Sequence, residues 1–71
     1  MRTEKLVMMA NQIGAFFAAQ GEERAVPQIA NHIEKFWDPR MRAKICAHVA
    51  GGGAGLDAKV CAAIQMLQAP G

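Results

Sequence analysis

Hydrophobic residues recur along the chain at the three- and four-residue spacing that is typical of amphipathic helices. This pattern predicts four helices and no strand, with the helices over about residues 3–20, 23–37, 39–50 and 57–68. We therefore expect an all-α fold, a small bundle of about four short helices, formed by residues 1–71 as a single helical domain.

Several residues mark the expected helix boundaries. Thr3 is predicted to cap the first helix, and Asp57 to cap the fourth. Pro27 suits the first turn of the second helix, because the N–H that proline lacks would have no partner there. Asp38 followed by Pro39 predicts both the end of the second helix and the N-cap of the third.

The inward-facing stripes of these helices predict the core. We assign it to the large apolar residues Phe16, Phe17, Ile29, Ile33, Phe36, Ile45 and Ile64. In a chain of only 71 residues, the gain from burial and the cost of conformational entropy nearly cancel. Truncating Phe36 to alanine is therefore expected to cost about 3 kcal/mol and to leave the chain largely unfolded.

The charge of the chain is mildly basic, with a formal net charge of +2. Basic residues cluster between Lys35 and Lys44, which keeps open a second reading as a small basic helical nucleic-acid-binding domain. However, Arg40 and Lys44 share one side of the third predicted helix, while Arg42 points about 160° away from Lys44. The basic residues thus do not form one recognition face, and nucleic acid is not the expected partner.

The residue types that carry chemistry are sparse. Cys46 and His48 are the closest pair of possible metal ligands, but helical positions two apart are rotated by about 200°, or about 160° by the shorter way, and so lie on nearly opposite sides of the helix. Two cysteines are also too few for a disulfide scaffold, which favours reduced thiols and an intracellular location. The longest apolar run is too short to span a membrane. We therefore predict no catalytic, cofactor-binding or metal-ligating residue.

The most informative feature is a lack of charge on two helices. No charged residue occurs from Leu6 to Gln20 or from Val60 to Gly71, so the outer faces there are small, neutral and methionine-containing. Such faces suit docking to a partner better than contact with water. Together with the turn after the second helix, they predict a partner interface at Met8, Trp37, Asp38, Pro39, Arg40 and Arg42. Trp37 fits the core equally well, so both readings stay open.

Three segments resemble a known family. They are Lys5–Ile13 with the following Phe16-Phe17, the segment Lys35–Arg42, and Gly52–Leu56. In this order they are similar to the delta subunit of NAD-dependent, molybdenum- or tungsten-containing formate dehydrogenases. The segment Lys35–Arg42, which reads KFWDPRMR, is the most specific of the three.

The resemblance implies a non-catalytic accessory subunit of a cytoplasmic complex, with a role in the assembly or stability of that complex. Its expected partners are the larger formate dehydrogenase subunits, above all the alpha subunit. Those subunits carry the bis-pyranopterin molybdenum or tungsten cofactor, iron–sulfur clusters and FMN, and the complex uses NAD. No cofactor is expected in this chain, because an iron–sulfur cluster needs about four cysteine ligands.

Overall fold

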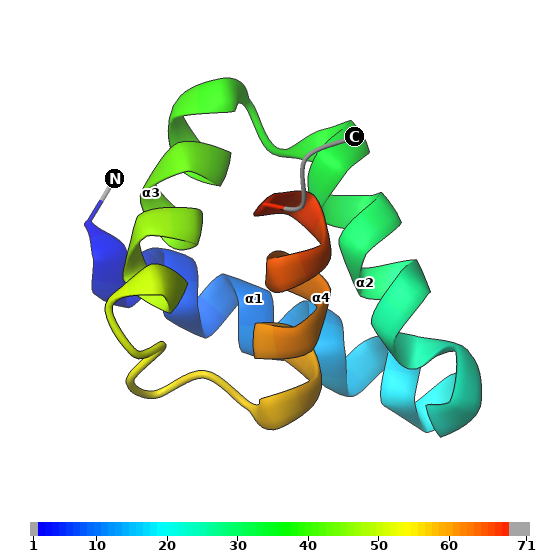
Figure 1. Ribbon diagram of the computed structural model, residues 1–71. Coiled ribbons are helices and arrows are strands. Elements are labelled where there is room, and N and C mark those ends of the chain that lie inside the picture. The colour runs from blue at the N-terminus through cyan, green and yellow to red at the C-terminus, as the bar shows by residue number, and fades with distance from the viewer. Residues whose placement is uncertain (1, 69–71) are drawn as a thin grey trace.

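The computed structural model describes residues 2–68, and their regular structure is entirely helical. The helices are α1 (Thr3–Gln20), α2 (Glu22–Phe36), α3 (Pro39–Ala50) and α4 (Ala58–Gln68) (Figure 1). The expected all-α bundle of four short helices is therefore confirmed. The ends of the predicted domain, residues 1 and 69–71, lie outside the described residues.

The turn between α2 and α3 has the predicted cap. The Asp38 carboxylate accepts a hydrogen bond from the backbone N–H of Met41 at 2.8 Å, and Pro39 is the first helical residue. The predicted cap of α1 is wrong, because Thr3 already belongs to the helix and Arg2 precedes it as the N-cap. The Arg2 carbonyl accepts the first helical bonds, so the backbone starts this helix without a side-chain cap.

The predicted place of Pro27 in the first turn is also wrong. Since α2 begins at Glu22, directly after Gly21, Pro27 is the sixth residue and lies inside the helix. A proline there leaves the carbonyl four residues earlier, that of Glu23, without its helical donor. Glu23 is exposed, so water can supply the missing hydrogen bond.

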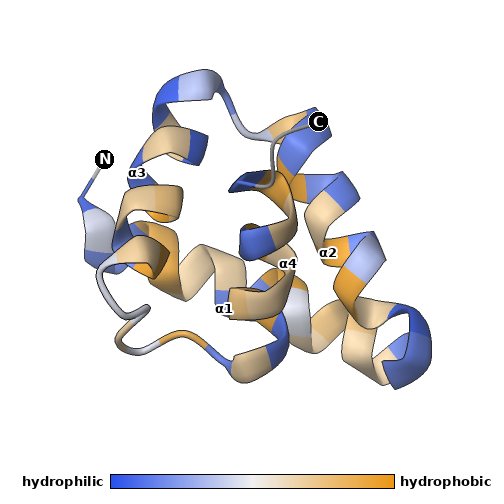
Figure 2. Ribbon diagram, in the orientation of Figure 1, coloured by the Kyte–Doolittle hydropathy of each residue, from blue (hydrophilic) through white to orange (hydrophobic). Residues whose placement is uncertain are grey.

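The fourth helix lies at the centre of the arrangement. Figure 1 shows α1 along the base, α2 and α3 rising on opposite sides, and α4 in front of α1 between the other two. In agreement with this view, α4 packs against α1, α2 and α3. Figure 2 shows that α1 and α4 are mostly apolar along their length, whereas α2 alternates between hydrophilic and hydrophobic residues.

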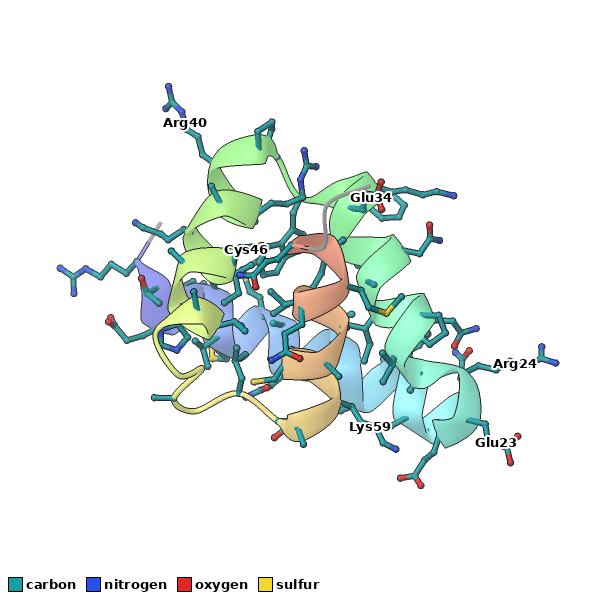
Figure 3. All side chains as sticks on the ribbon, in the orientation of Figure 1. Glu23, Arg24, Glu34, Arg40, Cys46 and Lys59 are labelled. Carbon is teal, nitrogen blue, oxygen red and sulfur yellow. The ribbon has the colours of Figure 1, made fainter. Side chains whose placement is uncertain are left out.

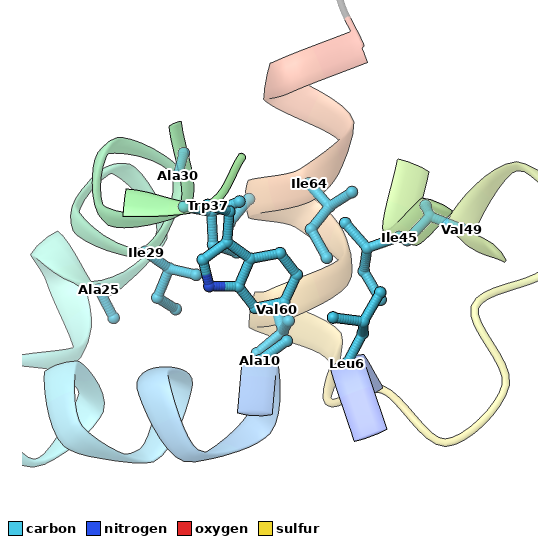
Figure 4. Close-up of a cluster of buried hydrophobic side chains, with 12 residues drawn as sticks. Leu6, Ala10, Ala25, Ile29, Ala30, Trp37, Ile45, Val49, Val60 and Ile64 are labelled. Carbon is cyan, nitrogen blue, oxygen red and sulfur yellow. The ribbon is translucent and has the colours of Figure 1, made fainter. Parts of the chain in front are cut away.

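The core is built from aliphatic side chains and alanines of all four helices, together with Trp37 (Figure 4). The six largest fully buried side chains are Leu6, Ile29, Ile33, Ile45, Val60 and Ile64. Four of these six residues were predicted for the core. Gly14 is buried as well, and a Cβ atom at its position would lie 2.5 Å from Cγ2 of Val60. A glycine at this point lets the backbone of α1 approach α4 closely.

Two of the predicted core residues are wrong. Phe16 is 59% exposed and Phe36 is 72% exposed, while Phe17 is half-buried at the edge of the core. Trp37, one residue beyond Phe36, is only 5% exposed. The spacing of apolar residues gives the direction of a side chain from its helix axis, but not whether another helix reaches that position. Phe36 is the last residue of α2, and Trp37 occupies the core at this end of the helix.

A pair of alanine substitutions tests this corrected core. We expect Ile33→Ala to lower the free energy of unfolding by about 2–5 kcal/mol, because it leaves a cavity in a closed core. Phe36→Ala removes an exposed ring and should cost less than about 1 kcal/mol. Urea unfolding followed by circular dichroism compares the two variants. Similar losses for both would contradict the core as described.

Candidate docking surface

An apolar groove lies between α1 and α2 and reaches the start of α3. Its volume is about 530 Å³, and the residues that line it are Met9, Gln12, Ile13, Phe16, Phe17, His32, Phe36, Trp37 and Met41. His32 is the only titratable residue among them. A groove of this size and character can hold apolar side chains of a partner, but it offers no set of groups for bond-breaking chemistry.

Four rings form a continuous row from α1 to α2. The centroids of Phe16 and Phe17 are 5.2 Å apart, those of Phe17 and His32 are 5.9 Å apart, and those of His32 and Phe36 are 4.7 Å apart. The first two pairs meet edge to face, an arrangement that the quadrupoles of aromatic rings favour. Each ring therefore supports the next, and the two exposed phenylalanines are held at the walls of the groove.

Trp37 connects this groove to the core. It is one of the residues that line the groove, and its indole lies within the cluster of buried side chains (Figure 4). Of the two readings that the sequence left open for Trp37, the structure supports the core. Because Trp37 is only 5% exposed, its side chain forms the floor of the groove and does not project from it.

Arg42, another predicted interface residue, is bound within the chain. Its Nη1 donates hydrogen bonds to the carbonyl oxygens of Glu34 at 2.9 Å and of Trp37 at 2.7 Å. These carbonyls belong to the C-terminal end of α2, where a positive charge also interacts favourably with the helix dipole. Arg42 thus fastens α3 to the end of α2. Arg42 is therefore engaged within the chain, which weakens the alternative prediction of a nucleic-acid-binding domain.

The six predicted interface residues therefore have different surroundings. Trp37, Asp38 and Arg42 have internal roles, whereas Met8, Pro39 and Arg40 are exposed. Figure 3 shows Arg40 extending away from the body of the molecule at the start of α3. An interface at these residues stays a prediction.

The loop between α3 and α4 is held by polar residues of the helices. Asn11 of α1 donates from Nδ2 to the Gly55 carbonyl at 2.9 Å and accepts at Oδ1 from the Asp57 N–H at 3.0 Å. Nε2 of His48 pairs with the Ala54 carbonyl at 2.7 Å. Asn11, which lies on the uncharged face of α1, therefore serves the fold.

The cysteines and histidines do not gather into a metal site. Over residues 2–68, no group of three or more His, Cys, Asp or Glu side chains is placed to hold a metal ion. Both cysteines are free and half-buried. Burial raises the pKa of the Cys46 thiol and outweighs the lowering by Gln68 and by the charge of Arg42. This thiol is therefore protonated at neutral pH, unlike a catalytic thiolate.

No helix within residues 2–68 has the length and apolarity to cross a bilayer.

Sequence reasoning missed the groove, although a signal for it was present. Phe16-Phe17 and Phe36-Trp37 are adjacent aromatic pairs, and neighbouring residues on a helix point about 100° apart. Both members of such a pair cannot lie at the centre of one inward stripe. One aromatic of each pair was therefore bound to lie near the edge of the core or outside it.

A comparison with family models decides the family. The model described as the NADH-dependent formate dehydrogenase delta subunit, FdsD, matches residues 5–64. The chain belongs to this family. The match spans the three segments that carry the resemblance, and it includes every residue that lines the groove. No curated protein and no solved structure gives a significant match.

Arg42 and Arg40 differ in their expected effect on stability. Arg42→Ala leaves two carbonyls without their charged donor and should cost about 1–2 kcal/mol. Arg40→Ala removes an exposed side chain and should change stability by no more than about 0.5 kcal/mol. Thermal and urea unfolding of both variants measure this. If Arg42→Ala were as stable as the unsubstituted chain, Arg42 would not fasten α2 to α3.

Proposed function

We propose that the chain is a non-catalytic accessory subunit of an NAD-dependent formate dehydrogenase and that it docks on a larger subunit, the alpha subunit, through the aromatic groove. In this proposal it supports the assembly or stability of a cytoplasmic complex. Family membership supports a place in that complex. The observation that carries the docking surface is the exposure of Phe16 and Phe36 on the two walls of one apolar groove.

The energy available at the groove supports docking. Burying one phenylalanine side chain stabilises an association by about 1.5–3 kcal/mol. Two rings together contribute about 3–6 kcal/mol, whereas immobilising a partner costs about 4–15 kcal/mol, so a stable complex needs further contact area. The uncharged face of α1 extends the surface, because Met8, Gln12 and Ala15 are exposed there. Rings and face together provide the apolar centre that a protein interface needs.

The chain's own side chains support a role without catalysis. The groove has no pair of acid and base groups, and His32 stands between two phenylalanine rings. The cofactors and the reaction would then reside entirely in the larger subunits. This chain would contribute a surface and no chemistry.

Truncating the exposed rings tests the docking surface. Phe16→Ala and Phe36→Ala should each weaken binding to a formate dehydrogenase complex that lacks this chain. The expected effect is about 2 kcal/mol, or roughly 30-fold in Kd, as for a central aromatic residue of an interface. Isothermal titration with the purified chain measures the affinity.

Met66→Ala provides the matched control. Met66 is 52% exposed and lies on α4, outside the groove. The Met66→Ala variant should bind the complex with the same affinity as the unsubstituted chain. Unchanged affinity of both phenylalanine variants, with their circular dichroism intact, would place the docking surface elsewhere.

The lack of a cofactor is tested separately. The purified chain without an affinity tag should contain no stoichiometric molybdenum, tungsten, iron or zinc, should show no flavin absorbance, and should not reduce NAD with formate. The physical reason is the shortage of ligands, since two half-buried cysteines cannot hold a cluster. Elemental analysis and absorption spectroscopy provide the measurement, and a metal at one equivalent would contradict this part of the proposal.

A further inference from the structure

We infer that the aromatic groove receives an amphipathic α-helix of the partner subunit, with apolar residues on the face that enters the groove and acidic residues beside them. This inference rests on the proposed function and specifies the chemistry of the docked segment. The shape of the groove and the charges around it support the inference independently.

The groove is shaped by two helical ridges. On α1, Met9, Ile13 and Phe16 follow each other at helical spacing, and on α2, His32 and Phe36 lie one turn apart. A cavity of about 150 Å³ holds a benzene molecule, so about 530 Å³ holds three or four groups of that size. A helix presents such a number of side chains in one row, at positions i, i+3 or i+4, and i+7. A β-strand would need a sheet edge, and residues 2–68 contain no strand.

Three exposed basic residues lie close in sequence to residues that line the groove. Lys5 lies one turn before Met9 on α1, and Lys35 directly precedes Phe36. Arg40 directly precedes Met41 and lines a neighbouring hollow that shares Met41 with the groove. All three are exposed, and they belong to three different helices.

Three acidic residues lie near these basic residues in sequence, and Glu4 among them is exposed on α1, about 100° around the helix from Lys5. Asp38 caps α3, and Glu34 lines a separate hollow with Arg42 and Met66 between α2, α3 and α4. Among the described residues, none that lines the groove is acidic. The rim thus presents positive charge around an apolar floor, and the complementary segment carries acidic residues.

The same charges disfavour a second copy of this chain as the occupant. A symmetric dimer across the groove would bring the same patch of both copies together. Lys5, Lys35 and Arg40 of one copy would then face a rim of equal charge, and the chain already carries a net charge of +2. Like charges at an interface select against that pairing, so a partner of opposite charge fits better.

Charge reversal at two matched arginines tests the inference. Arg40 is the second residue of α3 and Arg24 is the third residue of α2, and both are exposed. Figure 3 shows them at opposite ends of the molecule. Both Arg40→Glu and Arg24→Glu place an acid in the first turn of a helix, where the dipole favours it, so both should fold. They also change the net charge equally.

The measurement is the association of the full chain with a purified formate dehydrogenase complex that lacks it, over a range of salt concentrations. Arg40→Glu should slow association about tenfold at low salt, with a smaller difference at high salt where charges are screened. Arg24→Glu should stay within about twofold of the unsubstituted chain. Equal association rates of the two variants would overturn the inference that basic residues beside the groove attract an acidic segment of the partner.

A photo-crosslinking residue at position 36 identifies the occupant in the same assembled complex. Crosslinks to a segment with helical apolar spacing and neighbouring Asp or Glu residues would support the inference. Crosslinks to a basic or non-helical segment, or to a second copy of this chain, would overturn it. If Phe36→Ala and Arg40→Glu both bind like the unsubstituted chain, this inference fails and the accessory function stands. If the unsubstituted chain does not associate at all, both fail.

Discussion

The close approach of α1 and α4 is the constraint on which the rest of the structure depends. It is possible because Gly14 faces Val60, where any Cβ atom would collide with the valine side chain. Beside this contact with α1, α4 also packs against α2 and α3, and Val60, Ala63 and Ile64 are buried among the residues of those helices. A core closed by glycine, alanine and aliphatic side chains, with Trp37 enclosed at one end, is thin, and it has no room for every aromatic ring of the chain.

The exposed rings follow from this thin core. Several of its buried positions are alanines, including Ala10, Ala25 and Ala63. Because alanine side chains are small, the helices lie close together and leave no space between them for larger rings. Trp37 is enclosed at one end, while Phe16 and Phe36 stay outside and stack through Phe17 and His32. The surface that we propose for docking is thus a product of how the core is filled. The rings are held in place by one another and do not depend on a partner for their arrangement.

The helices and four of the six largest buried side chains could be predicted from the sequence, because local patterns determine them. The Asp38-Pro39 signal located a helix start correctly, and the inward stripes identified Ile29, Ile33, Ile45 and Ile64. Phe36 could not be assigned in this way, because its burial depends on whether a distant helix covers the end of α2. The role of Arg42 was also hidden, since the carbonyls of Glu34 and Trp37 face it only once the turn has formed. Features that depend on the tertiary arrangement therefore lay beyond the reach of a pattern along one chain.

The segment from Phe36 to Arg42 joins folding and docking in one place. Trp37 is part of the core and also the floor of the groove, whereas Phe36 projects beside it and contributes little to the core. Arg42 holds the carbonyl of Trp37, and Asp38 begins α3, so the backbone here is fixed from both sides. A change at Trp37 would alter the fold and the groove together and could not separate them. A change at Phe36 acts on the groove alone. In a chain with so small a core, a partner that binds the folded form also stabilises it by mass action. Docking at this surface would therefore strengthen the same turn that builds it.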